Sequence, residues 1–218
     1  MEMTLHRALA LKKTTLARID DEISKDEDFV TVEVGDSGKT MSNIKTSIAE
    51  KNIRARYDKI NQLIKNYIDI NCAISAANAG ITNTSETKAA LEYNGRKYSL
   101  TDMIQLKPVF VRRKRLLDIL EGGYNNTLRI IARKNDKVEE DVNAMISNMT
   151  GGDKNKPSGD EIKNITEAYN KSHVYNLVDP LGIASKLTGM KEDLIEFETT
   201  VDSRISELNA ITKINVDL

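Results

Sequence analysis

The stretch Pro180-Leu-Gly-Ile-Ala-Ser-Lys-Leu-Thr-Gly-Met-Lys-Glu-Asp-Leu-Ile-Glu-Phe-Glu-Thr-Thr-Val201 decides the fold class. Its apolar residues recur at alternating steps of four and three, and mostly Lys, Glu, Asp, Ser and Thr stand between them. This spacing places the apolar side chains on one narrow stripe of an α-helix, the surface by which helices pack along their lengths. After a one-residue slip the stripe continues, so the pattern predicts a helix over 180–214, capped by Asp179 and begun by Pro180. The stripe consists of Ile183, Leu187, Met190, Leu194, Phe197, Val201, Ile205, Leu208 and Ile211.

The same periodicity predicts helices over 4–26 and 42–79, the second ended by Gly80. A third should run from Ser99 or Thr101 to Glu121, with Pro108 starting or kinking its regular part. Gly122-Gly123 should interrupt it before a fourth stripe, and Asp160 should cap a short fifth helix ending at Tyr169. The predicted stripes contain Leu5, Leu9, Leu16, Ile19 and Ile23; Ile60, Ile64, Tyr67, Asn71, Ile74 and Asn78; Met103, Leu106, Phe110, Arg113, Leu117 and Leu120; and Leu128, Ile131, Val138, Val142, Met145 and Met149.

Two short segments have β character. Residues 29–34 alternate with period two, and Asn94-Gly95 joins two strand-like runs in the manner of a two-residue hairpin turn. A hairpin this small needs support, so it should pack on helices or pair with the 29–34 strand. The predicted fold is mainly α: an antiparallel long-helix bundle or coiled coil with a small β-hairpin, forming a single helical domain over 1–218.

Composition restricts the possible classes of partner. The chain has 218 residues, 32 Lys and Arg and 33 Asp and Glu, so its net charge of −1 gives no general attraction to nucleic acid or to an anionic membrane. The single cysteine, Cys72, excludes an internal disulfide framework and a cysteine-rich zinc site. No apolar run reaches the roughly 20 residues that span a bilayer, and no signal peptide is recognisable. We expect a cytoplasmic protein of a bacterial cell, made by the bacterium or by a phage.

Polar residues interrupt several apolar stripes. Lys12 interrupts the first, Asn71 and Asn78 lie one heptad apart in the second, and Arg113 lies in the third. An asparagine in such a stripe often fixes register or oligomeric state, and the alternative is that the two line a polar ligand pocket. An unpaired buried charge is costly, so Arg113 must meet a carboxylate, a partner chain or a bound anion.

A basic cluster, Arg112-Arg-Lys-Arg115, lies on the third predicted helix. Four consecutive residues point to all sides of a helix, which favours a solvated surface with ion pairs. The alternative is an anionic ligand near the hairpin, because arginine binds phosphate through two parallel hydrogen bonds. The candidate ligand-binding residues are Arg96, Lys97, Arg112, Arg113, Arg115, Asn71 and Asn78.

No pattern supplies a nucleophile together with a base. Gly38-Lys39-Thr40 resembles the end of a phosphate-binding loop, but Glu33 stands where that loop requires its first glycine. His6 and His173 lack the spaced partner of a metal site. We therefore expect a protein that is not an enzyme and has no cofactor or metal.

Three stretches resemble a family of small bacterial and phage proteins often labelled septicolysin. They are Leu9-Ala-Leu-Lys-Lys with Arg18-Ile19, Asn94-Gly-Arg96 with Ser99-Leu-Thr-Asp102, and Asp202-Ser-Arg204-Ile with Glu207-Leu-Asn209 and Thr212. The resemblance implies a long-helix bundle with a small β element and brings no catalytic residues with it. This chain differs from the family by what looks like an inserted segment over about 135–170.

Two hypotheses of function follow. The first is a non-enzymatic helical interaction protein that assembles as a homo-oligomer, with Asn71, Asn78 and Arg113 setting its register. The second is a binding protein that sequesters a small anionic, nucleotide-like molecule, for example a host immune signal.

Overall fold

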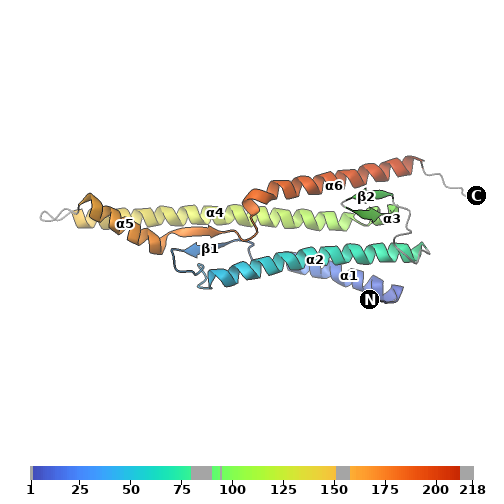
Figure 1. Ribbon diagram of the computed structural model, residues 1–218, viewed down its shortest axis with the longest axis horizontal. Helices are drawn as coiled ribbons and strands as arrows, with labels where there is room; N and C mark the ends of the chain where they lie inside the picture. The colour runs from blue at the N-terminus through green and yellow to red at the C-terminus, as the bar shows by residue number, and fades with distance from the viewer. Residues whose placement is uncertain (1, 80–89, 94, 151–157, 212–218) are drawn as a thin grey trace, which may run out of the picture. The chain divides into compact units, whose positions relative to one another are not determined.

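The computed structural model describes residues 2–79, 90–93, 95–150 and 158–211. It confirms a mainly α fold with long helices and a small β-hairpin (Figure 1). None of its helices is long and apolar enough, within the described residues, to cross a membrane. The elements in chain order are α1 (Leu5–Ile23), β1 (Thr31–Val34), α2 (Thr46–Asn78), β2 (Leu91–Tyr93), β3 (Arg96–Tyr98), α3 (Leu100–Ile104), α4 (Lys107–Thr150), α5 (Gly159–His173), β4 (Tyr175–Val178) and α6 (Ile183–Ile211).

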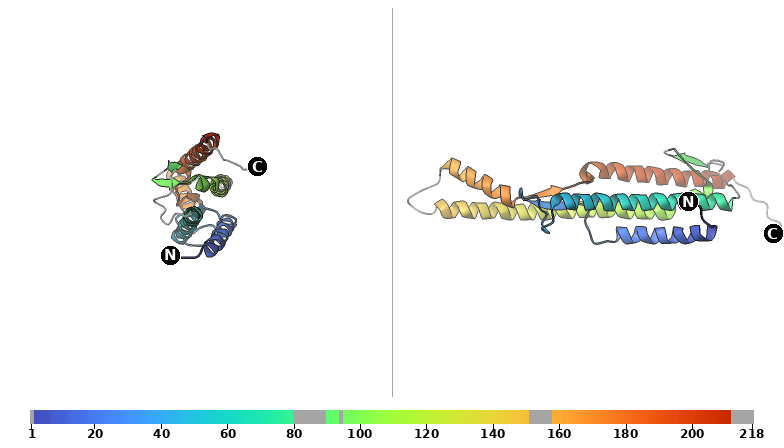
Figure 2. Two further views of the ribbon diagram at one scale, coloured as in Figure 1. Left: turned by 90° about the vertical axis from the view of Figure 1, so that its right-hand side faces the viewer. Right: turned by 60° about the horizontal axis from the view of Figure 1, so that its bottom comes forward.

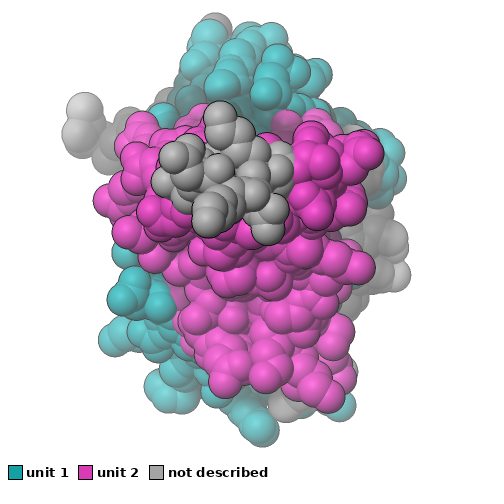
Figure 3. Space-filling view, turned by 90° about the vertical axis from the view of Figure 1, so that its left-hand side faces the viewer, with its two compact units in different colours: residues 1–26, 58–118, 186–218 teal, residues 27–57, 119–185 magenta. Residues whose placement is uncertain are grey.

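The chain divides into two compact units, which Figure 3 colours separately. Unit 1 comprises residues 1–26, 58–118 and 186–218, and unit 2 comprises 27–57 and 119–185. Three helices, α2, α4 and α6, contribute residues to both units. The expectation of a single domain stays a prediction.

In unit 1, α1 packs against α2 and α4. Lys59 of α2 bonds Glu22 near the end of α1, at an Nζ–Oε1 distance of 2.5 Å, whereas Lys12 in the middle of α1 bonds Asn71. The two helices therefore run antiparallel, as Figures 1 and 2 show. Arg112 of α4 reaches Asp20 of α1 at 2.6 Å. The predicted α2 stripe is buried from Ile60 to Ile74, but Asn78 is exposed and does not belong to it.

Phe197 of α6 is the centre of an aromatic cluster in unit 1. The ring of Tyr93 stacks on it with centroids 4.2 Å apart, and Phe110 and Tyr98 approach it to 5.5 and 5.7 Å. Such contacts add to the burial of apolar area that holds α6 in place. The hairpin β2–β3 thus packs on helices, which was one of its two predicted environments. Asn94, in the turn of the hairpin, lies outside the described residues.

Unit 2 contains a second antiparallel pair of strands. β1 pairs with β4, Thr31 opposite Val178 and Val34 opposite Tyr175, so the alternative pairing of the 29–34 segment with the hairpin is wrong. Asn135 of α4 fixes this sheet, because its amide donates to the carbonyl of Tyr175 at 3.0 Å and accepts from the same residue's N–H at 2.8 Å. A strand as short as β4 needs a partner from elsewhere in the chain, so the local sequence does not specify it.

Several predicted boundaries were wrong. Gly122-Gly123 does not interrupt α4, since the long flanking segments hold two glycines in helical geometry at a cost of about 1 kcal/mol each. The last helix begins at Ile183 rather than at Pro180, because Gly182 turns the chain with φ +69°. Ser158 caps α5 in place of Asp160. Gly80 lies outside the described residues.

Two predicted stripes are only partly buried in the structure. On α1 the buried face contains Ala8, Thr15 and Ile19, while Leu5 and Leu9 are 43% and 49% exposed. On α4 the predicted members Leu128, Met145 and Met149 are exposed, whereas Val138 and Val142 are buried as predicted. Apolar spacing predicts a helix, but the neighbour that each helix finds decides which side is buried.

We predict that Gly35→Ala destabilises the protein more than Gly38→Ala. A Cβ at Gly35 would lie 2.6 Å from the carbonyl oxygen of Lys171, whereas nothing lies within 4 Å of one at Gly38. Because both residues have positive φ, +54° and +65°, conformational strain alone should be similar. We expect the free energy of unfolding to fall by at least about 2 kcal/mol for Gly35→Ala and by about 1 kcal/mol for Gly38→Ala, measured by urea denaturation. Equal losses would contradict the packing of this turn on α5.

Candidate functional site

The polar interruptions of two apolar stripes meet in unit 1. The Nζ of Lys12 on α1 donates to Oδ1 of Asn71 on α2 at 2.6 Å and to Oε1 of Gln105, between α3 and α4, at 2.9 Å. It also lies 5.6 Å from the centroid of the Tyr67 ring. We call Lys12, Asn71 and Gln105 the amide–lysine cluster.

In the part of the chain that the structure describes, the amide–lysine cluster pairs the positive charge of Lys12 with two uncharged acceptors. Burial lowers the pKa of Lys12, and its two hydrogen-bond acceptors are neutral amide oxygens. Asn71 is only 3% exposed, so loss of Lys12 would leave a buried polar group without its donor. These bonds require one alignment of α1, α2 and the α3–α4 turn. Asn71 thus has a polar partner within the chain, and no ligand is needed to satisfy it.

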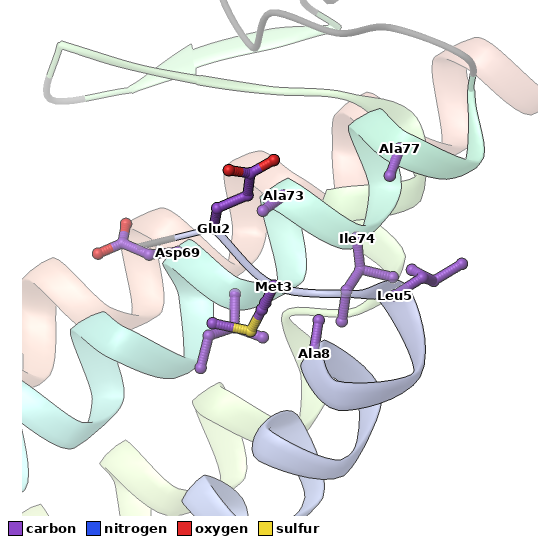
Figure 4. A pocket seen from close by; sticks show the side chains of 9 residues that line it. Glu2, Met3, Leu5, Ala8, Asp69, Ala73, Ile74 and Ala77 are labelled. Carbon is purple, nitrogen blue, oxygen red and sulfur yellow. The ribbon is translucent and has the colours of Figure 1, made fainter.

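An apolar groove of about 450 Å³ lies beside this cluster, between the start of α1 and the second half of α2 (Figure 4). Two carboxylates, Glu2 and Asp69, stand among otherwise apolar side chains. Most of the α2 residues that line it are alanines or isoleucines, which offer shape but no hydrogen bonds. The groove is lined by Glu2, Met3, Leu5, Ala8, Asp69, Ile70, Ala73, Ile74 and Ala77.

The basic residues predicted to bind an anion are distributed over two places. Arg112 donates to Asp20 and to the Pro108 carbonyl, and Arg115 donates to Ser24, so both face α1. Arg96 on β3 is instead paired with Asp69 of α2. Carboxylates already neutralise Arg96 and Arg112. An anion that bound either arginine would therefore have to displace its carboxylate.

The remaining candidates have different surroundings. Arg113 is half-buried, and its charge and that of Arg96 both act on the Tyr98 hydroxyl, so these two arginines lie on the hairpin side. Lys97 is exposed on β3, and Asn78 is exposed near the end of α2. The structure thus places Arg96 and Arg113 near Tyr98, whose pKa is raised chiefly by burial and lowered by their charges, and separately places Arg112 and Arg115 against α1. A ligand site built from all seven predicted residues stays a prediction.

Cys72 lies beneath the hairpin and is a poor nucleophile. Burial, followed by the negative charge of Asp102, raises the pKa of its thiol to about 11, although Arg96 opposes this with its sulfur contact at 3.9 Å. Asp102 is 3% exposed and accepts bonds from the N–H and hydroxyl of Ser99, which caps α3. At neutral pH the thiol is protonated, so it does not supply the thiolate that cysteine chemistry needs.

Metal-ligating side chains do not gather in the described residues: no group of three or more His, Cys, Asp or Glu is placed to hold an ion. The groove and Gln105 were missed by the sequence reasoning. Gln105 lies between two helices, where periodicity carries no signal. Lys12 and Asn71 were both recognised as polar interruptions of their stripes, and these were the available indications of the cluster.

We predict that Lys12 and Asn71 are energetically coupled. Lys12→Met and Asn71→Leu should each lower the free energy of unfolding by about 1–3 kcal/mol, because each leaves a polar partner unsatisfied. The double variant should lose less than the sum, by about 1–2 kcal/mol, because both polar groups are then gone. Urea denaturation of the four proteins measures this. The control is Lys13→Met at an exposed neighbouring position. Its effect on the free energy of unfolding should simply add to that of Asn71→Leu. If the effects of Lys12→Met and Asn71→Leu on the free energy of unfolding were additive, the hydrogen bond between the two residues would not fix register.

We predict slow, strongly pH-dependent alkylation of Cys72. With a pKa of about 11, its reaction with iodoacetamide should accelerate about tenfold per pH unit from pH 7 to 10. The unfolded protein in urea should react like an ordinary thiol, roughly a hundredfold faster at pH 8. Asp102→Asn should speed the reaction of the folded protein at pH 8, since it removes a charge that disfavours thiolate. A rate that levels off below pH 9 would contradict the assigned environment.

The chain was also compared with known proteins. No family model matches it, and neither a curated protein nor a solved structure shows detectable similarity to it. The resemblance to septicolysin-labelled proteins therefore stays a prediction, and the function has to be argued from the residues described above.

Proposed function

We propose that the chain is a non-enzymatic assembly protein that forms homo-oligomers through apolar helix surface in unit 1. The observation that carries this proposal is the groove of about 450 Å³ between α1 and α2, with Leu5 exposed on its wall and Leu9 exposed one turn further along α1. Exposed leucines beside an apolar groove favour contact with another protein surface, because association would remove both from water. Lining side chains without hydrogen-bonding groups suit an apolar partner better than a polar substrate.

The chemistry of the groove and its surroundings also favours binding over catalysis. The nearby thiol of Cys72 is protonated at neutral pH, and Asp69 is engaged by Arg96. The proposed assembly needs neither a nucleophile nor a cofactor. Cytoplasmic location and origin from a bacterium or phage stay predictions.

Capture of a small anionic, nucleotide-like molecule is the second candidate. Its support is Lys12, a partly buried cation whose bonded partners are uncharged amides. The ion pairs of Arg96 and Arg112 weaken this candidate, because binding would have to break them. We therefore rank assembly first.

The proposal predicts an oligomer at micromolar concentration. We expect light scattering coupled to size exclusion to give a mass that is a whole multiple of 24.4 kDa at about 100 µM, falling on dilution. Native mass spectrometry of gently purified protein should show the same multiple without additional mass. A monomer at about 100 µM would overturn the proposal, and roughly a few hundred extra daltons per chain, lost on denaturation, would support the second candidate instead.

A further inference from the structure

We propose that unit 2 binds an extended peptide segment of another protein between α4 and α5. Asparagine amides hold the main chain of that segment, and Glu139 meets a basic side chain that stands between two apolar ones. The site lies wholly in unit 2 and does not depend on the assembly proposed for unit 1. Three features carry this inference: an incompletely filled groove, polar groups without a partner, and an asparagine of the same groove that already binds main chain.

A groove of about 410 Å³ lies between α4 and α5, which are side by side in Figures 1 and 2. Its floor is apolar, because Val138 and Val142 of α4 are buried there. Helix α5, in contrast, has no buried residue, so it does not fill the space beside them. We call this the α4–α5 groove; it is lined by α4 between Asn135 and Ile146 and by Thr166, Asn170 and Val174.

Polar side chains on both walls of the α4–α5 groove have no partner in the part of the chain that the structure describes. The amides of Asn143 on α4 and Asn170 on α5 take part in no hydrogen bond there, and the carboxylate of Glu139 forms no ion pair. Thr166, by contrast, is satisfied, because its hydroxyl donates to the carbonyl of Ile162 at 2.9 Å. A few polar groups around an apolar floor are typical of sites that orient a ligand.

Asn135, at one end of the groove, shows what such an amide binds. Its Nδ2 donates to the carbonyl of Tyr175 at 3.0 Å, and its Oδ1 accepts from the N–H of the same residue at 2.8 Å. The N–H and C=O of an extended residue point to the same side, so one carboxamide satisfies both, as a neighbouring strand would. Asn143 and Asn170 present the same chemical group to the same groove, and within the described residues no main chain is bonded to it.

The position of Asn143 leaves space for a separate segment. Asn143 follows Asn135 by eight residues, which is about 12 Å along the helix, or roughly three to four residues of extended chain. A segment bonded to Asn143 therefore need not displace β4. Side chains alternate along an extended chain, so two apolar side chains two residues apart can both face the floor formed by Val138 and Val142. The volume of the groove lies within the roughly 300–1,000 Å³ of ligand pockets.

Charge selects the remaining side chain of the segment. Glu139 lines the groove and is followed by Glu140 and Asp141, so an acidic segment would be repelled. A lysine or arginine between the two apolar residues of the segment meets Glu139 instead. A small amine would use only this carboxylate and leave both amides unbonded, and the groove of unit 1 has no amide among its lining side chains. A basic and apolar peptide in the α4–α5 groove thus uses each of the unpartnered groups.

The amides are tested by NMR titration of the full chain with three blocked tripeptides, acetyl-Ala-Lys-Ala-amide, acetyl-Val-Lys-Val-amide and acetyl-Leu-Lys-Leu-amide. We expect the side-chain amide signals of Asn143 and Asn170 to shift, with dissociation constants of about 0.1–1 mM. Asn143→Ala and Asn170→Ala should each raise the dissociation constant about three- to tenfold, because each removes hydrogen bonds to the peptide. The matched controls, Asn148→Ala and Asn164→Ala, remove exposed amides of the same helices outside the groove and should change the constant by less than about twofold.

Main-chain recognition and charge are tested separately. The same peptides methylated on every backbone nitrogen keep their side chains but cannot donate from the main chain, so the wild-type protein should bind them at least about threefold more weakly. Glu139→Gln should raise the dissociation constant of the unmethylated peptides about two- to fivefold at low salt, and this effect should shrink as salt rises. Glu140→Gln is the control: it removes the neighbouring charge, which does not line the groove, and should change the constant by less than about 1.5-fold.

Three results would overturn peptide binding in this groove. The first is that none of the three peptides shifts the two amide signals at about 5 mM. The second is an equal effect of Asn143→Ala and Asn148→Ala on the dissociation constant. The third is unchanged affinity for the methylated peptides together with weaker binding in Glu139→Gln, which would assign the groove to amines. The variants replace exposed or half-buried side chains, so their circular dichroism spectra and melting temperatures should match those of the wild type.

Discussion

One amino group determines how three helical segments of unit 1 meet. Lys12 extends from α1 into a position where its neighbours are the amide oxygens of Asn71 and Gln105 and the ring of Tyr67. Removing a lysine from water is unfavourable, and burial accordingly lowers its pKa. The arrangement is tolerated only when both acceptors are in reach, which restricts the helices to one register.

The groove exists because of that register. Ala8 lies one turn before Lys12 on α1, and Ile74 and Ala77 follow Asn71 on α2, so the contact that anchors the two helices also sets the distance between their walls. The small alanines keep the space between the walls open. The apolar groove is thus a consequence of the internal polar contact. A shift of α1 by one turn would remove both the polar contact and the groove.

The arginines illustrate how tertiary contacts change the meaning of a sequence cluster. Arg112 to Arg115 are adjacent in sequence and could have formed one cationic surface. In the folded protein, Arg112 and Arg115 bond α1, while Arg113 lies on the hairpin side and acts on Tyr98. The bonds of Arg112 and Arg115 therefore join helices, which weakens the case for a phosphate-bearing ligand.

The sequence by itself determined the mainly α class, the long helices, the hairpin and the burial of most apolar stripes, because these follow from local spacing and turn chemistry. It also marked Lys12 and Asn71 as polar residues in apolar stripes. Only the tertiary structure decided that these two meet, that β1 pairs with β4, and that Leu5 and Leu9 face outward. Each of those outcomes depends on contacts between segments that are far apart in the chain. Periodicity along one helix says which side is apolar, but not which neighbour will cover it.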